Sequence, residues 1–303
     1  MGMTVMNRLE PLVDSTALLS DPAALREQAR EDGYLYFRNF LPREKLLDLR
    51  RQMLELAREA GWLHADRPLM DGIANPGTFV MEFSAARPEW RVFYRKLQSL
   101  RDFQALAHSP KILRVFEAIF GEAVLVQPRN MSRLMFPGDT TYTTPPHQDH
   151  IHIRGTPETW TCWFPVGDCP TKLGGLAVLP GSHKVGLMKT KPMPGAGGTG
   201  VEIAEDAVWA GGDLQMGDVI MFHSLTVHQG RDNQTADQVR LSCDYRYQPV
   251  SQPVDADSLE PHGAVVDWAE VYAGWPKAGP EGDPIQYYWK KHELKITHGK
   301  GKY

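Results

Sequence analysis

The hydrophobic pattern divides the chain into a helical first part and a strand-rich second part. Apolar residues recur every three or four positions over residues 42–60 and again over 87–120, which predicts amphipathic helices. From residue 123 onward, apolar residues form short runs separated by turn residues, a pattern typical of β-strands. The expected strands cover residues 123–127, 131–136, 160–166, 176–179, 218–222, 225–228 and 240–247.

A shorter helix and a strand are expected near the start of the chain. Asp21 suits the N-cap position and is followed by Pro22 at the first helical position. Gly33 suits the C′ position, where the helix should end. The aromatic-rich run 34–40 then predicts a buried strand, and residues 1–19 are expected to be irregular.

These elements predict an α+β, mainly β fold. Short strands at regular intervals are typical of a sandwich or a barrel. Because the sequence contains neither an internal repeat nor a second core, we predict one domain over residues 1–303. Its expected parts are a helical support (20–120), a barrel-like core (123–250) and a C-terminal tail (251–303).

Two segments lack a clear periodicity. The Gly/Pro-rich segment 186–213 is long enough to predict a functional lid rather than a plain connection. The tail after residue 250 is rich in proline, yet its aromatic residues predict that it packs back on the core. These aromatic residues are Trp268, Trp275, Tyr287, Tyr288 and Trp289.

Composition and charge exclude some classes of protein. The formal net charge of -4 and the lack of a basic stripe give no reason to expect binding to nucleic acid or to an anionic membrane. No window is long and apolar enough to span a bilayer, and the first residues lack the apolar core of a signal peptide. Three scattered cysteines (Cys162, Cys169 and Cys243) form no disulfide framework, which favours a reducing, cytoplasmic compartment.

The first candidate for chemistry is the triplet His147-Gln148-Asp149. If the triplet is extended, side chains at positions i and i+2 share one face, so His147 and Asp149 would point the same way. The same alternation places His150 and His152 on the opposite face, and we do not expect them to be ligands. A histidine and a carboxylate on one face could hold a metal ion.

A second candidate lies about 80 residues further along the chain. His228 follows an apolar run, and a polar turn near residue 235 leads to Arg240 and Ser242. A hairpin centred on this turn would pair residue 228 with 242, so these side chains would share one face. Arginine binds a carboxylate through two parallel hydrogen bonds, so this face would suit a dicarboxylate beside a metal.

In this order, the motifs resemble the phytanoyl-CoA dioxygenase family of Fe(II)/2-oxoglutarate-dependent oxygenases. Within the family, the chain is most similar to bacterial members that hydroxylate terpenoid natural products. The resemblance covers residues 34–248. Its motifs are GYLYFRNFL (33–41), TPPHQD (144–149), WTCWFPV (160–166), GGLAVLPGSH (174–183), MGDVIMFHSLTVH (216–228) and RLSCDYR (240–246).

The resemblance implies a double-stranded β-helix (jelly-roll, cupin-like) core with N-terminal helices packed on its major sheet. It implies that His147, Asp149 and His228 hold Fe(II) and are the catalytic centre. The expected reaction hydroxylates a C–H bond of a small organic molecule with dioxygen and 2-oxoglutarate, and it releases succinate and carbon dioxide. Related halogenases carry a small residue at the position of Asp149, so its carboxylate favours hydroxylation.

The resemblance also implies a cosubstrate site. Arg240 would anchor the distal carboxylate of 2-oxoglutarate with help from Ser242, and Trp163 falls where the family often has an aromatic residue beside the cosubstrate. Trp163 also suits a plain core position. Ascorbate is a further expected support of activity. Arg133 could contact a substrate carboxylate or form a salt bridge within the sheet.

Three alternatives stay open at the level of sequence. The same oxidative chemistry could give desaturation, epoxidation or cyclisation, because the outcome depends on where the substrate carbon lies relative to iron. A jelly-roll metal protein without oxygen chemistry would not need Arg240 near the metal, and a pure interaction scaffold would not need buried ligands. Substrate identity and homo-oligomerisation are not encoded in any motif that we recognise.

Overall fold

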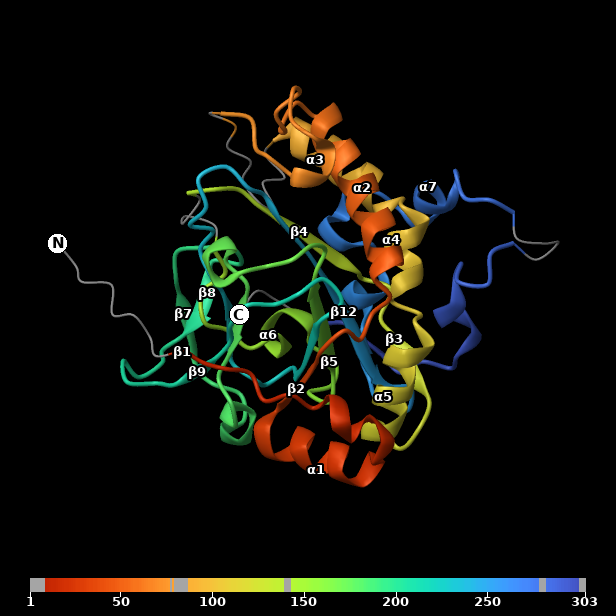
Figure 1. Ribbon diagram of the computed structural model, residues 1–303. Coiled ribbons are helices and arrows are strands. Elements are labelled where there is room, and N and C mark those ends of the chain that lie inside the picture. The colour runs from red at the N-terminus through yellow and green to blue at the C-terminus, as the bar shows by residue number, and fades with distance from the viewer. Residues whose placement is uncertain (1–8, 77, 79–86, 139–142, 278–281, 300–303) are drawn as a thin grey trace.

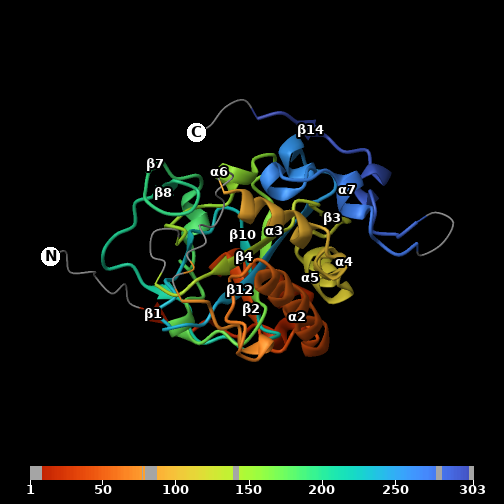
Figure 2. The same ribbon diagram turned by 90° about the horizontal axis from the view of Figure 1, so that it is seen from above.

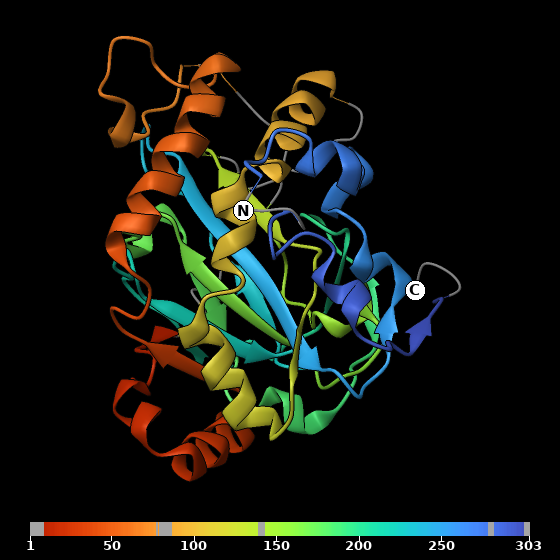
Figure 3. The same ribbon diagram turned by 90° about the vertical axis from the view of Figure 1, so that its right-hand side faces the viewer.

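In the computed structural model of the protein, two β-sheets face each other and helices cover the outer face of the larger sheet (Figures 1 and 3). The structure describes residues 9–76, 78, 87–138, 143–277 and 282–299. This arrangement is the predicted α+β jelly-roll.

The larger sheet is antiparallel and has six strands in the order β2-β10-β5-β12-β3, with β4 paired to β12 as well. Its longest strand, β12, contacts three neighbours and forms the centre of the sheet. The strands are β2 (Tyr34–Phe37), β3 (Val124–Val126), β4 (Met131–Met135), β5 (Trp160–Pro165), β10 (Val219–His223) and β12 (Arg240–Pro249).

The smaller sheet has four strands in the order β1-β9-β6-β11, and two short two-stranded ribbons lie outside both sheets. Ribbon β7–β8 lies within the predicted lid, on the opposite side of the molecule from the helical layer (Figure 2). The strands are β1 (Leu9–Glu10), β6 (Leu176–Val178), β9 (Trp209–Ala210), β11 (His228–Gly230), β7 (Thr190–Pro192), β8 (Thr199–Val201), β13 (Val254–Asp255) and β14 (Ile296–Thr297).

Helices α1 to α5 lie within the segments predicted to be helical, whereas α6 and α7 were not predicted. The Asp21 side chain accepts hydrogen bonds from the first backbone N–H groups of α1, and Gly33 ends this helix with φ 71°. None of the described helices is both long and apolar enough to cross a membrane. The helices are α1 (Pro22–Asp32), α2 (Arg43–Glu59), α3 (Pro88–Gln98), α4 (Arg101–Leu106), α5 (Pro110–Phe120), α6 (His150–Ile153) and α7 (Trp268–Tyr272).

Strand β12 joins the helical layer to the interior of the jelly-roll. The Tyr247 ring stacks on Phe116 of α5 at 4.5 Å, and its hydroxyl donates to the Ala107 carbonyl. Tyr245 likewise donates to the Phe103 carbonyl, at 2.6 Å. Because side chains alternate along a strand, the even-numbered residues of β12 face away from the helices, toward the other sheet.

The C-terminal tail packs on the core, as its aromatic residues predict. Trp268, Trp275 and Trp289 are all buried in the main hydrophobic cluster. Buried indole N–H groups usually have an acceptor, and here Trp268 donates to the Leu259 carbonyl and Trp275 to the Ser99 carbonyl, both at 2.8 Å. The tail therefore closes over the helical layer rather than extending from it.

Two expectations about local structure are wrong. Residues 225–227 form a turn between β10 and β11 instead of a strand. Within the segment expected to be irregular, residues 9–10 pair with β9 and residues 16–20 form a 3-10 turn, whereas residues 1–8 lie outside the described part. Short edge strands such as β1 take their structure from the neighbouring strand, so no local pattern predicts them.

Asp218 helps to hold the edge strand β2 against its neighbour β10 in the larger sheet. Its buried carboxylate accepts hydrogen bonds from the Tyr36 hydroxyl and from the backbone N–H groups of Asn39 and Gln215. We expect Asp218→Ala to lower the free energy of unfolding by about 3 kcal/mol, because buried donors lose their acceptor. Urea denaturation measures the loss, and the exposed Asp213→Ala should cost less than about 1 kcal/mol.

Candidate metal centre and its cavity

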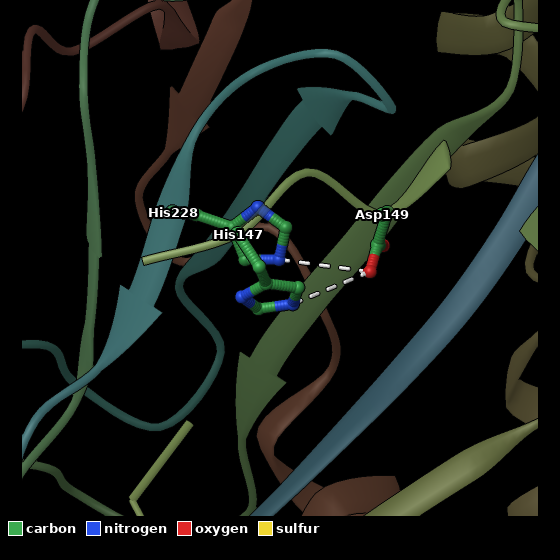
Figure 4. A group of neighbouring side chains, drawn as sticks. All are labelled: His147, Asp149 and His228. Atoms are coloured by element: carbon green, nitrogen blue, oxygen red, sulfur yellow. Dashed lines mark ion pairs between the residues drawn. The ribbon is translucent and has the colours of Figure 1, made fainter. Parts of the chain in front are cut away.

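Three buried side chains come together between the two sheets. His147 precedes α6, Asp149 is its N-cap and His228 begins β11. Both histidine Nε2 atoms lie 3.7 Å from Asp149 Oδ1 (Figure 4). Because the three potential ligand atoms lie within 4.8 Å of one another, they can hold one metal ion.

The two imidazoles are oriented for metal binding. His147 Nδ1 lies 2.9 Å from the Pro145 carbonyl oxygen, and His228 Nδ1 lies 2.9 Å from the Thr226 carbonyl oxygen. A carbonyl only accepts, so each Nδ1 carries the proton and each Nε2 presents a lone pair to the centre. Burial, followed by electrostatic repulsion from His147, lowers the pKa of His228 to about 3. The His228 imidazole is therefore neutral.

The second oxygen of Asp149 is held by other residues. Thr161 Oγ1 donates to Oδ2 at 2.5 Å, and Arg246 Nη2 lies 3.4 Å from the same atom. Burial opposes ionisation of this carboxyl, but Arg246 and the two histidines outweigh it and hold the pKa of Asp149 well below its usual value. The carboxylate is therefore ionised, with Oδ1 left for a metal.

The backbone at the triplet differs from the extended form that we expected. His147 and His228 exchange backbone hydrogen bonds at 3.0 Å, but Asp149 is already in the helical region and α6 follows directly. The helical turn brings His152 to within 5.9 Å of the His147 ring, where it lines the cavity. The prediction that His152 faces away is wrong, because strand alternation does not apply beyond Asp149.

Gln148 fastens the lid to the metal-binding motif. This fully buried side chain donates through Nε2 to the carbonyls of Leu225 (2.7 Å) and Gly186 (2.9 Å), and its Oε1 accepts from the Met188 N–H at 2.8 Å. Further along the lid, Val201 N–H donates to the Pro146 carbonyl at 2.8 Å. The lid and the ligand-bearing segment are thus one hydrogen-bonded unit.

The metal-binding cluster lies where two lobes of one cavity meet. The outer lobe has a volume of about 240 Å³, and the inner lobe is narrower. The two lobes share Arg133, Thr144, His147, Asp149 and Arg246 as lining residues. A metal ion held here would face both lobes at once.

The inner lobe brings together two of the three residues predicted to bind a cosubstrate, Trp163 and Arg240. Trp163, Arg240 and His228 all line it. Ser242 is fully buried on the same face of β12, and its Oγ has no hydrogen-bond partner among the described residues. A buried hydroxyl without a partner, next to a guanidinium, fits a bound carboxylate such as that of 2-oxoglutarate.

The strands that carry His228 and Arg240 do not form the predicted hairpin. His228 belongs to β11, which pairs with β6 in the smaller sheet, whereas Arg240 begins β12 in the larger sheet. The connection between them crosses from one sheet to the other, with Asn233 Nδ2 bonded to the carbonyls of Met135 and Gln238. The hairpin prediction is wrong, but the expected proximity of these side chains holds.

Arg133 forms the salt bridge that was one of its two predicted roles. Its Nε lies 3.4 Å from Asp244 Oδ2, and its Nη1 donates to Thr144 Oγ1 at 3.2 Å. It lines both lobes as well. A salt bridge across the sheet thus holds this arginine at the wall of the cavity.

Several cavity residues were missed by sequence reasoning. Asp244 and Arg246 share the parity of Arg240 on one strand, so alternation along RLSCDYR could have found them. Arg129 and His262 come from a loop and from the tail, and no motif marks them. Only the three-dimensional structure brings these two side chains to the cavity.

Comparison with known proteins identifies the family. The phytanoyl-CoA dioxygenase (PhyH) model matches residues 29–242. The chain is 30% identical over 263 residues to the 1-deoxypentalenic acid 11-beta-hydroxylase of Streptomyces arenae, covering 82% of this chain and 88% of that protein. The hydroxylase of the same name from Streptomyces exfoliatus is 30% identical over 269 residues, covering 84% and 90%.

Solved structures share the fold at lower identity. The epimerase SnoN, crystallised with Fe3+, alpha-ketoglutarate and nogalamycin RO, has a TM-score of 0.56 at 20% identity and covers 92% of this chain and 98% of its own. The carbocyclase SnoK has a TM-score of 0.53 at 18% identity, covering 81% and 89%. Both are described as non-haem, alpha-ketoglutarate-dependent proteins.

The jelly-roll fold and the His-Asp-His cluster inside it define a non-haem iron, 2-oxoglutarate-dependent dioxygenase of the hydroxylating kind. The chain belongs to the phytanoyl-CoA dioxygenase family. Its predicted resemblance to bacterial terpenoid hydroxylases is confirmed.

The lid fastening can be tested with two matched variants. Gln248 is also fully buried, and its Nε2 donates to two backbone carbonyls, those of Gln252 and Pro253. We expect Gln148→Ala and Gln248→Ala to lose similar stability, about 3 kcal/mol each. Hydrogen exchange should accelerate in residues 186–201 in Gln148→Ala only. An unchanged exchange rate there would contradict the proposed role of Gln148.

Proposed function

We propose that His147 Nε2, Asp149 Oδ1 and His228 Nε2 hold Fe(II) for hydroxylation of a small organic molecule. The observation that carries the proposal is the position of this cluster, at the junction of a lobe suited to 2-oxoglutarate and a larger, separate lobe. Two imidazoles and one carboxylate form the facial triad of non-haem Fe(II) oxygenases, which leaves coordination positions open.

Arg240, Ser242 and Trp163 form the proposed cosubstrate site. The Arg240 guanidinium is buried and donates to the carbonyls of Gly174 and Gly175, which fix its direction. Its charge and the unused Ser242 hydroxyl would bind the distal carboxylate of 2-oxoglutarate, while the Trp163 ring forms the wall. This site also argues against a metal protein without oxygen chemistry, which would not need Arg240 here.

The chain itself supplies position and exclusion of water. When bound, Fe(II) and 2-oxoglutarate supply the oxidation, in which dioxygen provides the hydroxyl oxygen and succinate and carbon dioxide are released. Thr161 and Arg246 keep Asp149 Oδ2 occupied, so this carboxylate offers one oxygen to the metal. The lid, fastened by Gln148, contributes Ala196 and Gly197 to the wall of the outer lobe, where they would help to exclude solvent water.

Hydroxylation is the proposed outcome because Asp149 supplies the third protein ligand, at the position where related halogenases have a small residue. Desaturation, epoxidation or cyclisation would require the same centre with a different placement of the substrate. Similarity to the 1-deoxypentalenic acid hydroxylases supports a terpenoid-type substrate in the outer lobe, with Arg133 at its wall. Ascorbate would maintain the metal as Fe(II).

The remaining proposals concern the setting of the enzyme. One catalytic domain, residues 1–303, is supported by the burial of the tail tryptophans against the helical layer. Free, buried cysteines support a reducing, cytoplasmic compartment. The net charge of -4 supports small molecules rather than nucleic acid or membranes as partners, and a homo-oligomer remains compatible with all of these features.

The metal site can be tested by comparing two histidines. We expect His228→Ala to lose bound Fe(II) and to lower 2-oxoglutarate turnover about 10³-fold or more, since the metal contributes several kcal/mol. His223, on β10, packs against Trp160 and should tolerate alanine. Metal analysis and succinate formation measure both effects. Full iron content and turnover in His228→Ala would overturn the proposal.

The cosubstrate site makes a separate prediction. We expect Arg240→Ala to raise the KM for 2-oxoglutarate by about 10–150-fold, because a charged hydrogen bond contributes about 1.5–3 kcal/mol. Ser242→Ala should have a smaller effect of about tenfold, as it removes one neutral donor. Steady-state kinetics at saturating iron measures both. Equal KM values in Arg240→Ala and the unmodified protein would exclude Arg240 as the anchor.

A further inference from the structure

The outer lobe of the cavity has more positive than negative charge. Among its described lining residues, Arg129, Arg133 and Arg246 face a single carboxylate, that of Asp149. The described lining of the inner lobe adds one carboxylate, that of Asp244, and one guanidinium, that of Arg240, which is the proposed anchor of the cosubstrate. Four guanidinium groups thus share two carboxylates across the two lobes, and three of the four line the outer lobe.

Two of the three arginines have carboxylate partners within the protein. Arg246 Nη2 lies 3.4 Å from Asp149, and Arg133 Nε lies 3.4 Å from Asp244. Both acidic residues are almost completely buried, so these pairs belong to the permanent structure of the site. In the outer lobe, the guanidinium without a carboxylate partner among the described residues is therefore that of Arg129.

Arg129 is bound to the protein by one neutral contact. Its Nη1 donates to the Asp257 backbone carbonyl at 2.8 Å, and it forms no ion pair with any described residue. The nearby Asp257 carboxylate is paired with Arg154. Since a guanidinium has five N–H donors, most of those on Arg129 stay available to a ligand.

The environment makes this guanidinium a strong anion site. Arg129 is half-buried, and burial followed by repulsion from Arg246 lowers the pKa of Arg129. Placing a charge in such a wall is unfavourable without a counter-ion, so an incoming anion relieves this cost. A single carboxylate matches one guanidinium through two parallel hydrogen bonds.

Part of the wall of the outer lobe is apolar, beside the polar side chains of Thr144, His152 and His262. Met131, Ile153 and Ala196 line it together with Arg129, and the volume of about 240 Å³ is small. A ligand that fills this lobe would have its apolar part between Arg129 and the metal-binding cluster. This combination describes a compact carboxylic acid with a hydrocarbon part that contacts Met131, Ile153 and Ala196.

We propose that Arg129 binds the carboxylate of the substrate and thereby fixes which C–H bond lies at the metal. The inference rests on the proposed function, because it assigns the substrate to the same cavity. It adds that the substrate is an acid and that its charged end lies at Arg129. Arg133, already paired with Asp244, forms the wall beside it.

Binding can be measured without turnover. The probes are 1-deoxypentalenic acid, on which the matched relatives act, and its methyl ester, titrated calorimetrically into protein loaded with Mn(II) and 2-oxoglutarate. The unmodified protein should bind the acid at least about tenfold more tightly than the ester. Arg129→Gln should weaken acid binding by about 10–150-fold, leave ester binding unchanged and so remove the preference. Arg129→Lys should retain part of the preference for the acid over the ester.

A matched control separates recognition from general stability. Arg50 is also a partly buried arginine that donates to backbone carbonyls, those of Val166 and Met70, but it lies outside the cavity. Arg50→Gln should keep the preference for the acid, and thermal melting should confirm that each variant is folded.

Three results would overturn the role of Arg129. These are failure of the unmodified protein to bind the acid, equal binding of acid and ester, and a preserved preference in Arg129→Gln. A loss of preference in Arg50→Gln would also count against it. The proposed function fails on a different result, namely no succinate formation from 2-oxoglutarate by the Fe(II)-loaded protein. The two failures are therefore distinguishable.

Discussion

The alternation of side chains along β12 is the constraint on which both the core and the site depend. Its odd-numbered residues, such as Tyr245 and Tyr247, pack and hydrogen-bond against the helical layer. Its even-numbered residues, such as Arg240 and Arg246, face the cavity. A shift of one residue in register would exchange the two sets, so the aromatic contacts that stabilise the fold also hold the charged side chains in place.

The carboxylate of Asp149 shows how a buried charge is stabilised inside this core. One oxygen lies near the two histidines, and the other accepts from Thr161 and faces Arg246. Burying an ion is unfavourable unless it is paired and hydrogen-bonded, and here both conditions are met before any metal binds. The ligand geometry is therefore a property of the folded chain, with the metal adding to an arrangement already present.

The local patterns predicted helices α1 to α5 and the strands of the larger sheet, whereas α6, α7 and the short strands of the lid and of the tail were not predicted. The pairing of strands distant in sequence was not predicted correctly either. Helix α1 begins after Asp21 and ends at Gly33 as expected, because capping depends on residues that are neighbours in sequence. The hairpin prediction was wrong because contacts between residues distant in sequence decide whether two successive strands pair with each other. Here these contacts place β11 and β12 in different sheets. His152 was misplaced because a helical turn begins at Asp149, and Arg129 lies in a loop with no motif.

The β7–β8 ribbon of the lid packs closely on the metal-binding segment both in its stem, at Gly200 of strand β8, and in its tip (residues 193–198), at Gly195. A side chain at Gly200 would collide with Met193 and the Pro146 carbonyl, so the stem tolerates little change next to the metal-binding motif. Ala196, at the tip, lines the outer lobe, where extra methyl groups would occupy open volume. Gene duplicates of such an enzyme could therefore diverge in what they oxidise through single exchanges at Ala196, while inheriting an unaltered iron site.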